Sequence, residues 1–291
     1  MKDTRNPLVS VVIPAHNEEL FITKALQSLS EQKFTDFELI VVDNNSTDKT
    51  SEIAERFGAK VIHEHQRGVG AARQAGFLAA KGEIIATTDA DTILPPDWLA
   101  RIVDEFQKDK KLVAFGGLYT LYSGPLTARI TLFYFAHPAW FLDKVFSGGW
   151  GLPGVNFSVR KDAFFRVGGF KTDLTLGEDA EISRRLKHVG RVWLDPRFRV
   201  QTSGRRYRGG LIAGVMAYIP NGIMRIIFKK HKFTKLPTIR SERLLFSRFL
   251  SRTLVLLAIL SLSFFYFSHH YSTKAGSKKP DFVANKSKGK K

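Results

Sequence analysis

The first half of the chain alternates short runs of β-branched residues with longer stretches in which apolar residues recur at helical spacing. The short runs predict strands over 9–13, 38–42, 60–63 and 83–88, with Pro14 closing the first of them. The longer stretches predict helices over 18–32, 46–57 and 69–81, the second of them capped by Ser46 or Thr47. Further strands are expected over 112–118 and 155–159, and a helix over 179–188. Because this alternation is typical of βα units, we predict an α/β fold with a mostly parallel sheet flanked by helices.

Polar residues follow three of the predicted strands at their C-terminal ends. His16 and Asn17 come after the first strand, residues 43–48 after the second, and Asp89 ends the fourth. In an open α/β sheet ligands bind at this edge, because loop backbone and helix N-termini converge there. The polar groups of 43–48 fit hydrogen bonds to a nucleobase or ribose, but they also fit a helix cap with Asx turns. His16 is either part of a base pocket or an ordinary loop histidine.

The Asp89-Ala90-Asp91 sequence stands at the end of an apolar strand. Two carboxylates one residue apart can face the same hard cation, since Mg²⁺ and Mn²⁺ prefer oxygen ligands and leave positions for substrate phosphates. A solvated acidic turn is the alternative interpretation of the same three residues. The motif is therefore a candidate metal site that needs support from its surroundings.

A second acidic pair, Glu178 and Asp179, begins the predicted helix near residue 179. A carboxylate there can take the proton from an acceptor hydroxyl as a general base, or it can simply stabilise the positive end of the helix dipole. Arg73 lies on the predicted helix just before the Asp89 strand, where a cation can meet phosphate or an acidic side chain.

The net charge of +18 is concentrated in the last third of the chain. Residues 1–196 hold 24 Lys and Arg against 25 Asp and Glu, whereas residues 197–252 hold 14 against Glu242 alone. Residues 274–291 hold seven lysines against Asp281. A nucleic-acid-binding protein would need a basic patch on the folded domain, which is nearly neutral through residue 196, so the distribution favours a membrane. The absence of cysteine excludes disulfides and thiolate metal sites.

The last part of the chain predicts membrane attachment. Residues 205–252 mix basic and apolar side chains like a segment on a bilayer surface, and residues 274–291 resemble a disordered Lys-rich tail. Residues 253–273 carry no Asp, Glu, Lys or Arg and are long enough for one transmembrane helix, with a buried or interfacial helix as the alternative. The arginines before this stretch favour a catalytic domain on the cytoplasmic face, while the lysine tail favours the opposite orientation.

Residues 8–200 resemble the family-2 glycosyltransferases of the nucleotide-diphospho-sugar transferase fold, often called GT-A. The matching strings, in chain order, are 9–19, 41–48, Arg73 in its Gly/Ala helix, Asp89-Ala90-Asp91, 153–156, 167–170 and 177–179. Each string is common by itself, whereas the complete series in this order is specific. The resemblance implies a Rossmann-like GT-A glycosyltransferase domain over 1–204.

The resemblance also implies a role for each matching residue. Those implied to bind the nucleotide-sugar donor are Pro14, His16, Glu18, Asp43, Asn44, Arg73 and Asp89. Asp91, together with Asp89, is implied to bind a divalent metal, Mg²⁺ or Mn²⁺, which neutralises the leaving diphosphate. Asp179 is implied to be the general base, with Glu178 as its neighbour. Family members of this type invert the anomeric centre by direct displacement.

The chain departs from the family pattern in two places. Asn44 stands where many uridine-using relatives have a second acid and His16 where they have an aromatic residue, so the resemblance leaves the base of the donor open. The QxxRW string of processive synthases is absent, and residues 191–195 stand near its place, which favours transfer of single sugars.

The predicted function is therefore an inverting, metal-dependent glycosyltransferase of single-sugar type. Its acceptor is expected to be a lipid-linked or glycan acceptor at the membrane, as in the synthesis of cell-envelope polysaccharide or glycolipid. A non-catalytic relative that binds nucleotide-sugar or lipid is the main alternative, although none of the expected carboxylates is missing. A basic nucleic-acid-binding protein is a further alternative that charge alone would suggest.

Overall fold

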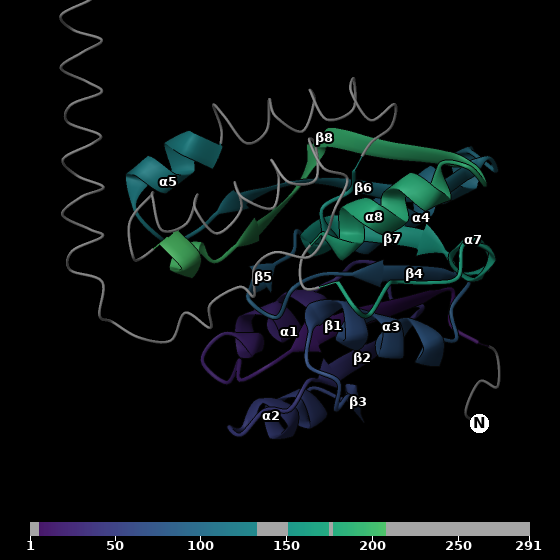
Figure 1. Cartoon of the computed structure of the whole chain (residues 1–291). Helices are drawn as coiled ribbons and strands as arrows, with labels where there is room; N and C mark the ends of the chain where they lie inside the picture. The colour runs from purple at the N-terminus through teal and green to yellow at the C-terminus, as the bar shows by residue number, and fades with distance from the viewer. Residues whose placement is uncertain (1–5, 133–150, 175–176, 208–291) are drawn as a thin grey trace, which may run out of the picture. The chain divides into compact units, whose positions relative to one another are not determined.

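The structure is a computed structural model that describes residues 6–132, 151–174 and 177–207, all of them within the compact unit Met1–Glu242 (Figure 1). The predicted membrane-surface segment beyond residue 207, the predicted transmembrane helix 253–273 and the tail 274–291 lie outside the described residues. Among the residues described, no helix has both the length and the apolar character needed to span a bilayer.

An eight-stranded mixed sheet forms the centre of the described structure, with the strand order β3-β2-β1-β4-β7-β6-β8-β5. The strands, in chain order, are β1 (Val9–Ala15), β2 (Phe37–Asp43), β3 (Lys60–His63), β4 (Ile84–Thr87), β5 (Thr92–Ile93), β6 (Leu112–Leu121), β7 (Phe157–Arg160) and β8 (Arg191–Thr202). The strands β1 to β4 are mutually parallel where they pair, and β6 pairs in parallel with β8. The pairs β4·β7, β6·β7 and β5·β8 are antiparallel. The predicted α/β class with a mixed, mostly parallel sheet is thus confirmed.

Helices cover both faces of the sheet (Figure 1). They are α1 (Ile22–Ser30), α2 (Thr50–Arg56), α3 (Val69–Ala79), α4 (Trp98–Lys108), α5 (Leu126–Thr131), α7 (Lys161–Arg166) and α8 (Glu178–Leu186), with short 3-10 turns η2 (Gly154–Asn156) and η3 (Gly204–Tyr207). Side chains of α1, α2 and α4 pack in one buried cluster, and those of α3, α7 and α8 pack in another.

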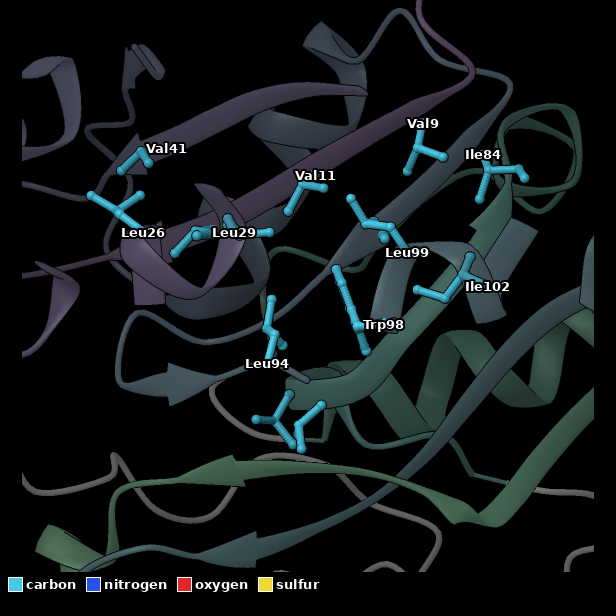
Figure 2. Packing of buried hydrophobic residues seen from close by; sticks show 14 of the residues in the cluster. Val9, Val11, Leu26, Leu29, Val41, Ile84, Leu94, Trp98, Leu99 and Ile102 are labelled. Atoms are coloured by element: carbon cyan, nitrogen blue, oxygen red, sulfur yellow. The ribbon is translucent and has the colours of Figure 1, made fainter. Parts of the chain in front are cut away.

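Strand β1 contributes to both clusters because successive side chains of a strand point to opposite faces. Val9 and Val11 belong to the cluster under α1 and α4, whereas Val12 belongs to the cluster under α3. Figure 2 shows the first cluster, in which side chains of β1, α1 and α4 converge, with the fully buried Trp98 among them. The buried β1 thereby fixes the edge of the sheet at which residues 16–18 emerge.

The prediction that Pro14 closes the first strand is wrong, since β1 continues through Pro14 to Ala15. The carbonyl oxygen of Val12 accepts from Thr88, which is on the β4 side, and Pro14 two residues later faces the same way. The ladder between β1 and β4 ends at Val12, while the ladder with β2 continues to Ala15. On the β4 side of Pro14 the described structure has no strand acceptor that would need a backbone N–H, so a proline is tolerated at this position.

The predicted cap of the second helix is also wrong. Helix α2 begins at Thr50, after Lys49 as the capping residue, and not after Ser46 or Thr47. The backbone N–H of Ser46 donates to the Asp43 carboxylate at 2.9 Å, so it closes a loop after β2 and does not start a helix. Helix α1 likewise starts at Ile22, four residues later than the predicted start at residue 18. Helix α4 and strand β8 are further elements that are not among those predicted from the sequence.

Candidate active site

The predicted site residues gather at the C-terminal edge of the parallel strands and at the start of α8. Ala15 and Asp43 end β1 and β2 side by side, and Asp89 follows β4 by two residues. Helix α8 brings Glu178 and Asp179 to the same edge. The contacts of Arg73 on α3 with both Asp89 and Glu178 show this proximity. Residues distant in the chain are thus joined by direct contacts.

Arg73 is a buried cation held between two carboxylates. Its Nη2 donates to Asp89 Oδ1 at 2.8 Å, and its Nη1 donates to Glu178 Oε1. Only 4% of the Arg73 side chain is exposed, so its charge depends on these acids for compensation. Burial by itself would lower the pKa of Arg73, but the charges of Glu178, Asp89 and Asp179 outweigh it and raise that pKa. Arg73 therefore ties the end of β4 to the start of α8.

Glu178 is buried beside Arg73, and its protonation is shifted accordingly. Burial, reinforced by the neighbouring charge of Asp179, raises the pKa of Glu178 to about 7, although Arg73 acts in the opposite direction. Glu178 is thus more easily protonated than an exposed glutamate, and its contact with Arg73 stabilises its charged form.

Asp179 is half-buried and is oriented by backbone N–H groups. Its Oδ2 accepts from the N–H of Gly154 at 2.7 Å, and its Oδ1 accepts from its neighbour Ala180 at 2.7 Å. Gly154 is required by this arrangement, because a Cβ atom there would lie 2.4 Å from Arg73 Nη1. Of the neighbours Glu178 and Asp179, Asp179 is the one less enclosed by the protein.

Asp91, the second acid of the Asp-Ala-Asp motif, is almost fully buried and is engaged on both oxygens. Thr202 Oγ1 donates to Asp91 Oδ1 at 3.1 Å, and Arg205 Nε lies 3.0 Å from Asp91 Oδ2. Burial raises the pKa of Asp91 to about 6, against the opposing charge of Arg205. Arg205 also forms a two-pronged ion pair with Glu18, with N–O distances of 2.6 and 2.5 Å.

The loops after β1 and β2 form a second, adjoining part of the site. Asp43 accepts from the Ser46 N–H and, at 2.7 Å, from Ser51 Oγ, and His63 Nδ1 lies 3.3 Å from its Oδ2. Burial alone would raise the pKa of Asp43, but the hydrogen bonds from Ser46 and Ser51 hold it below the usual value. His16 Nδ1 is buried and finds no hydrogen-bond partner among the described residues.

Asn44 is engaged within the protein itself. Its Nδ2 donates to the carbonyl oxygens of Glu64 and Gln66, both at 2.8 Å, and its Oδ1 accepts from the Gly68 N–H at 2.9 Å. These three bonds hold the loop that leads into α3. The predicted contact of Asn44 with a nucleobase stays a prediction, and Pro14 lies half-buried in the same region.

Charge and ligand chemistry at the site fit a divalent cation. Among the contacting groups, five carboxylates (Glu18, Asp89, Asp91, Glu178 and Asp179) face only two guanidinium groups, those of Arg73 and Arg205. The side chain of Asp89 is 39% exposed, and oxygen is the ligand that Mg²⁺ and Mn²⁺ prefer. Within the described ranges, however, no three acidic or histidine side chains are grouped closely enough to hold a metal by themselves. Substrate phosphate would have to supply the remaining ligands.

Sequence reasoning missed Arg205, Thr202 and Gly154 as site residues. Arg205 was assigned to the membrane-surface segment, yet its guanidinium reaches Glu18, 187 positions earlier in the chain. The pairing of Thr92 in β5 with Thr202 in β8 brings this distant segment beside Asp91. A run of basic residues gave no signal by which one arginine could be singled out.

Comparison with protein families gives a match over the first part of the chain. The model of the family described as glycosyl transferase family 2 matches residues 10–167, more than half of the 291 residues. The probable glycosyltransferase YdaM of Bacillus subtilis is 30% identical over 201 residues, which cover 63% of this chain and 47% of YdaM. The chain thus spans about half the length of this curated relative.

Two solved structures share the fold. The mannosyltransferase PcManGT of Pyrobaculum calidifontis, in complex with GDP-Man and Mn²⁺, superposes with a TM-score of 0.54 at 24% identity, covering 75% of this chain and 66% of its own. Glucosyl-3-phosphoglycerate synthase of Mycobacterium tuberculosis, in complex with Mn²⁺, UDP and glucosyl-3-phosphoglycerate, gives a TM-score of 0.56 at 21% identity over 77% of this chain and 80% of its own. At these identities the likeness concerns the GT-A-like fold.

Proposed function

Since the chain belongs to glycosyl transferase family 2, we propose that it transfers a single sugar from a nucleotide-diphospho-sugar to an acceptor hydroxyl with inversion at the anomeric carbon. One observation carries this proposal. Asp89 and Glu178, from separate parts of the chain, are both bonded to the buried Arg73 at the ligand-binding edge of the sheet, and Asp179 stands next to Glu178 at the start of α8. Neither a solvated acidic turn nor a simple helix cap requires a buried arginine between the two acidic motifs.

The donor nucleotide would lie across the ends of β1 and β2. His16 stands at the end of β1, where its buried Nδ1 has no hydrogen-bond partner among the described residues, and the Asp43 carboxylate, kept ionised by its hydrogen bonds, can accept from a donor group of the nucleotide. Asp89 and Asp91 would hold a divalent ion, Mg²⁺ or Mn²⁺, which would supply positive charge to the leaving diphosphate. The Mn²⁺ and nucleotide in the complexes of both structural neighbours support this assignment.

Asp179 is proposed as the general base. The acceptor oxygen would form a bond to the anomeric carbon, its proton would pass to Asp179, and the nucleoside diphosphate would leave with the electron pair of the broken bond. The Gly154 N–H fixes one oxygen of Asp179, so the carboxylate is held in one orientation. Glu178 is almost fully buried and is engaged by Arg73, so Asp179 is the better placed of the two acids to meet an acceptor.

The acceptor is proposed to be lipid-linked or to be a glycan close to the membrane, with the catalytic domain on the cytoplasmic face. The segment charge of residues 197–252 supports this, because each cation near an anionic surface contributes about 1 kcal/mol. Transfer of one sugar per acceptor is proposed from the absence of the processive string.

The test is metal-dependent release of nucleoside diphosphate from a panel of nucleotide-sugars, with isoprenoid-phosphate and glycan acceptors, using the purified full chain. Asp91→Asn and Asp179→Asn should each lower the rate by a factor of about 10²–10⁴. Asp162→Asn on α7 is the matched control, since its carboxylate is 68% exposed and pairs only with Arg166 among the described residues. Donor binding without turnover in every acceptor set would favour the non-catalytic alternative, and full activity of Asp179→Asn would refute the assigned base.

A further inference from the structure

Arg205 contacts one oxygen of Asp91, which is an acid of the proposed metal site. Its Nε is 3.0 Å from Asp91 Oδ2, while the other oxygen, Oδ1, accepts from Thr202 at 3.1 Å. Each oxygen of Asp91 thus has one contact with a group of the protein itself. Because the guanidinium places a positive charge beside Oδ2, a cation that binds this oxygen has to compete with Arg205.

The position of Arg205 is defined by more than Asp91. Its two Nη atoms each donate to one oxygen of Glu18, which is the fork arrangement that a guanidinium and a carboxylate prefer. The guanidinium carbon also lies 4.4 Å from the centre of the Phe21 ring, within the range of a cation–π contact. With 21% of its side chain exposed, Arg205 is anchored at the site and is not a loose surface cation.

The two ion pairs of Arg205 differ in the number of contacts they contain. The contact with Glu18 uses two nitrogen atoms, whereas the contact with Asp91 uses Nε alone. Arg205 can thus release Asp91 and remain bound to Glu18. The excess of carboxylates over guanidinium groups at the site means that a dication would compensate the charge of Asp91 better than the single charge of Arg205 does.

We propose that Arg205 is a positioning residue that competes with the divalent cation for Asp91 and gives up its contact with Asp91 when the cation binds. This rests on the proposed metal-dependent function and extends it to a residue outside the Asp-Ala-Asp motif. Arg205 competes with the metal for Asp91 Oδ2, so it lowers the affinity for metal in the absence of nucleotide-sugar. Because one hydrogen bond between charged groups is at stake, the expected effect is on the order of tenfold.

The experiment measures Mn²⁺ binding directly, from the electron paramagnetic resonance signal of free Mn²⁺ titrated into the purified full chain without nucleotide. Arg205→Met should bind Mn²⁺ about tenfold more tightly than the wild-type chain. Arg205→Lys, which keeps the charge but not the fork, should show a smaller increase. Arg197→Met removes an exposed cation from β8 and should leave the affinity unchanged.

A residue with a merely structural role would lower thermal stability without tightening metal binding. If Arg205→Met does not fold, Arg205→Lys decides the matter, and unchanged or weaker Mn²⁺ binding in the folded variant would overturn the proposal. The Asp91→Asn variant separates the two proposals. If Mn²⁺ binds the wild-type chain in a way that needs Asp91 but does not respond to Arg205, only the role of Arg205 fails. If no binding depends on Asp91, with or without UDP and GDP, the metal-dependent function fails as well.

Discussion

Replacing Arg73 by methionine should strongly destabilise the protein, because it leaves two acids without their buried partner. Arg73 is only 4% exposed, and its guanidinium contacts Glu178, itself 4% exposed, as well as Asp89. Removing one member of a buried ion pair costs about 3–5 kcal/mol, since the remaining charge is uncompensated. For a domain of this size the midpoint of thermal unfolding should fall by roughly 6–20 °C.

The pH dependence of this loss provides a sharper criterion. The folded-state pKa of Glu178 is raised to about 7 from a reference value of 4.5, so its protonated form is the one that the fold favours. The stability associated with this group is fully present below pH 4.5 and is lost as the pH rises to about 7. Without Arg73 the pKa of Glu178 should rise further. Arg73→Met should therefore be more destabilised, relative to wild type, at pH 8 than at pH 5.

The assay is thermal unfolding of the full chain followed by circular dichroism at both pH values, with a double-mutant cycle. Glu178→Gln in the Arg73→Met background should recover part of the lost stability, because it removes the buried charge. The exposed pair Arg166 and Asp162 offers a control, and Arg166→Met should change stability by no more than ~0.5 kcal/mol. An Arg73→Met variant that loses less than ~1 kcal/mol, or equal amounts at both pH values, would refute the buried ion pair as described.

Three further predictions concern the surroundings of the site. Gly154→Ala should lower transferase activity by about tenfold or more, because the Cβ atom of the new alanine would lie 2.4 Å from Arg73 Nη1 and would displace the Arg73 side chain. A steady-state rate equal to that of the wild-type chain would contradict this prediction. Trp98→Phe should lower the free energy of unfolding in urea by about 1–3 kcal/mol, because Trp98 Nε1 donates to the buried Asn156 Oδ1 at 2.9 Å and that oxygen would lose its donor. An unchanged free energy of unfolding would count against this bond. Asp43→Asn should lower the thermal midpoint at pH 7, because the folded state holds the pKa of Asp43 below 3.8. The difference from the wild-type midpoint should shrink as the pH falls below 3.8, and a difference that stays constant down to pH 3 would oppose the assigned cause.

The local sequence pattern identified most of the first half of the fold. Strand β3 lies at residues 60–63 as predicted, and β2 and β4 agree with their predicted ranges to within one residue at each end. Each of these strands contains a run of two to four consecutive branched apolar residues, and such runs specify a strand locally. The sequence of α4 does contain a helical pattern, since the apolar residues Trp98, Ile102 and Phe106 recur at intervals of four residues.

Two predictions failed because a hydrogen-bonding partner changed the role of a residue. A proline ends a strand only where a neighbouring strand needs its backbone N–H. At Pro14 this depends on where the ladder between β1 and β4 stops. Ser46 is a good helix-capping residue, but the Asp43 carboxylate captures its N–H in a loop. A distant strand pairing thus decides the first case, whereas in the second a side-chain hydrogen bond within the loop competes with helix capping.

The sequence by itself determined the family, the α/β alternation and the acidic motifs, because these depend on short strings and on periods of two and 3.6 residues. The tertiary structure alone decided which of these groups touch. It placed Arg73 between Asp89 and Glu178, and it brought Arg205 to Asp91 through the pairing of β5 with β8. The physical reason is that an ion pair between distant segments depends on the packing of the sheet that joins them, and not on the residues that flank each partner.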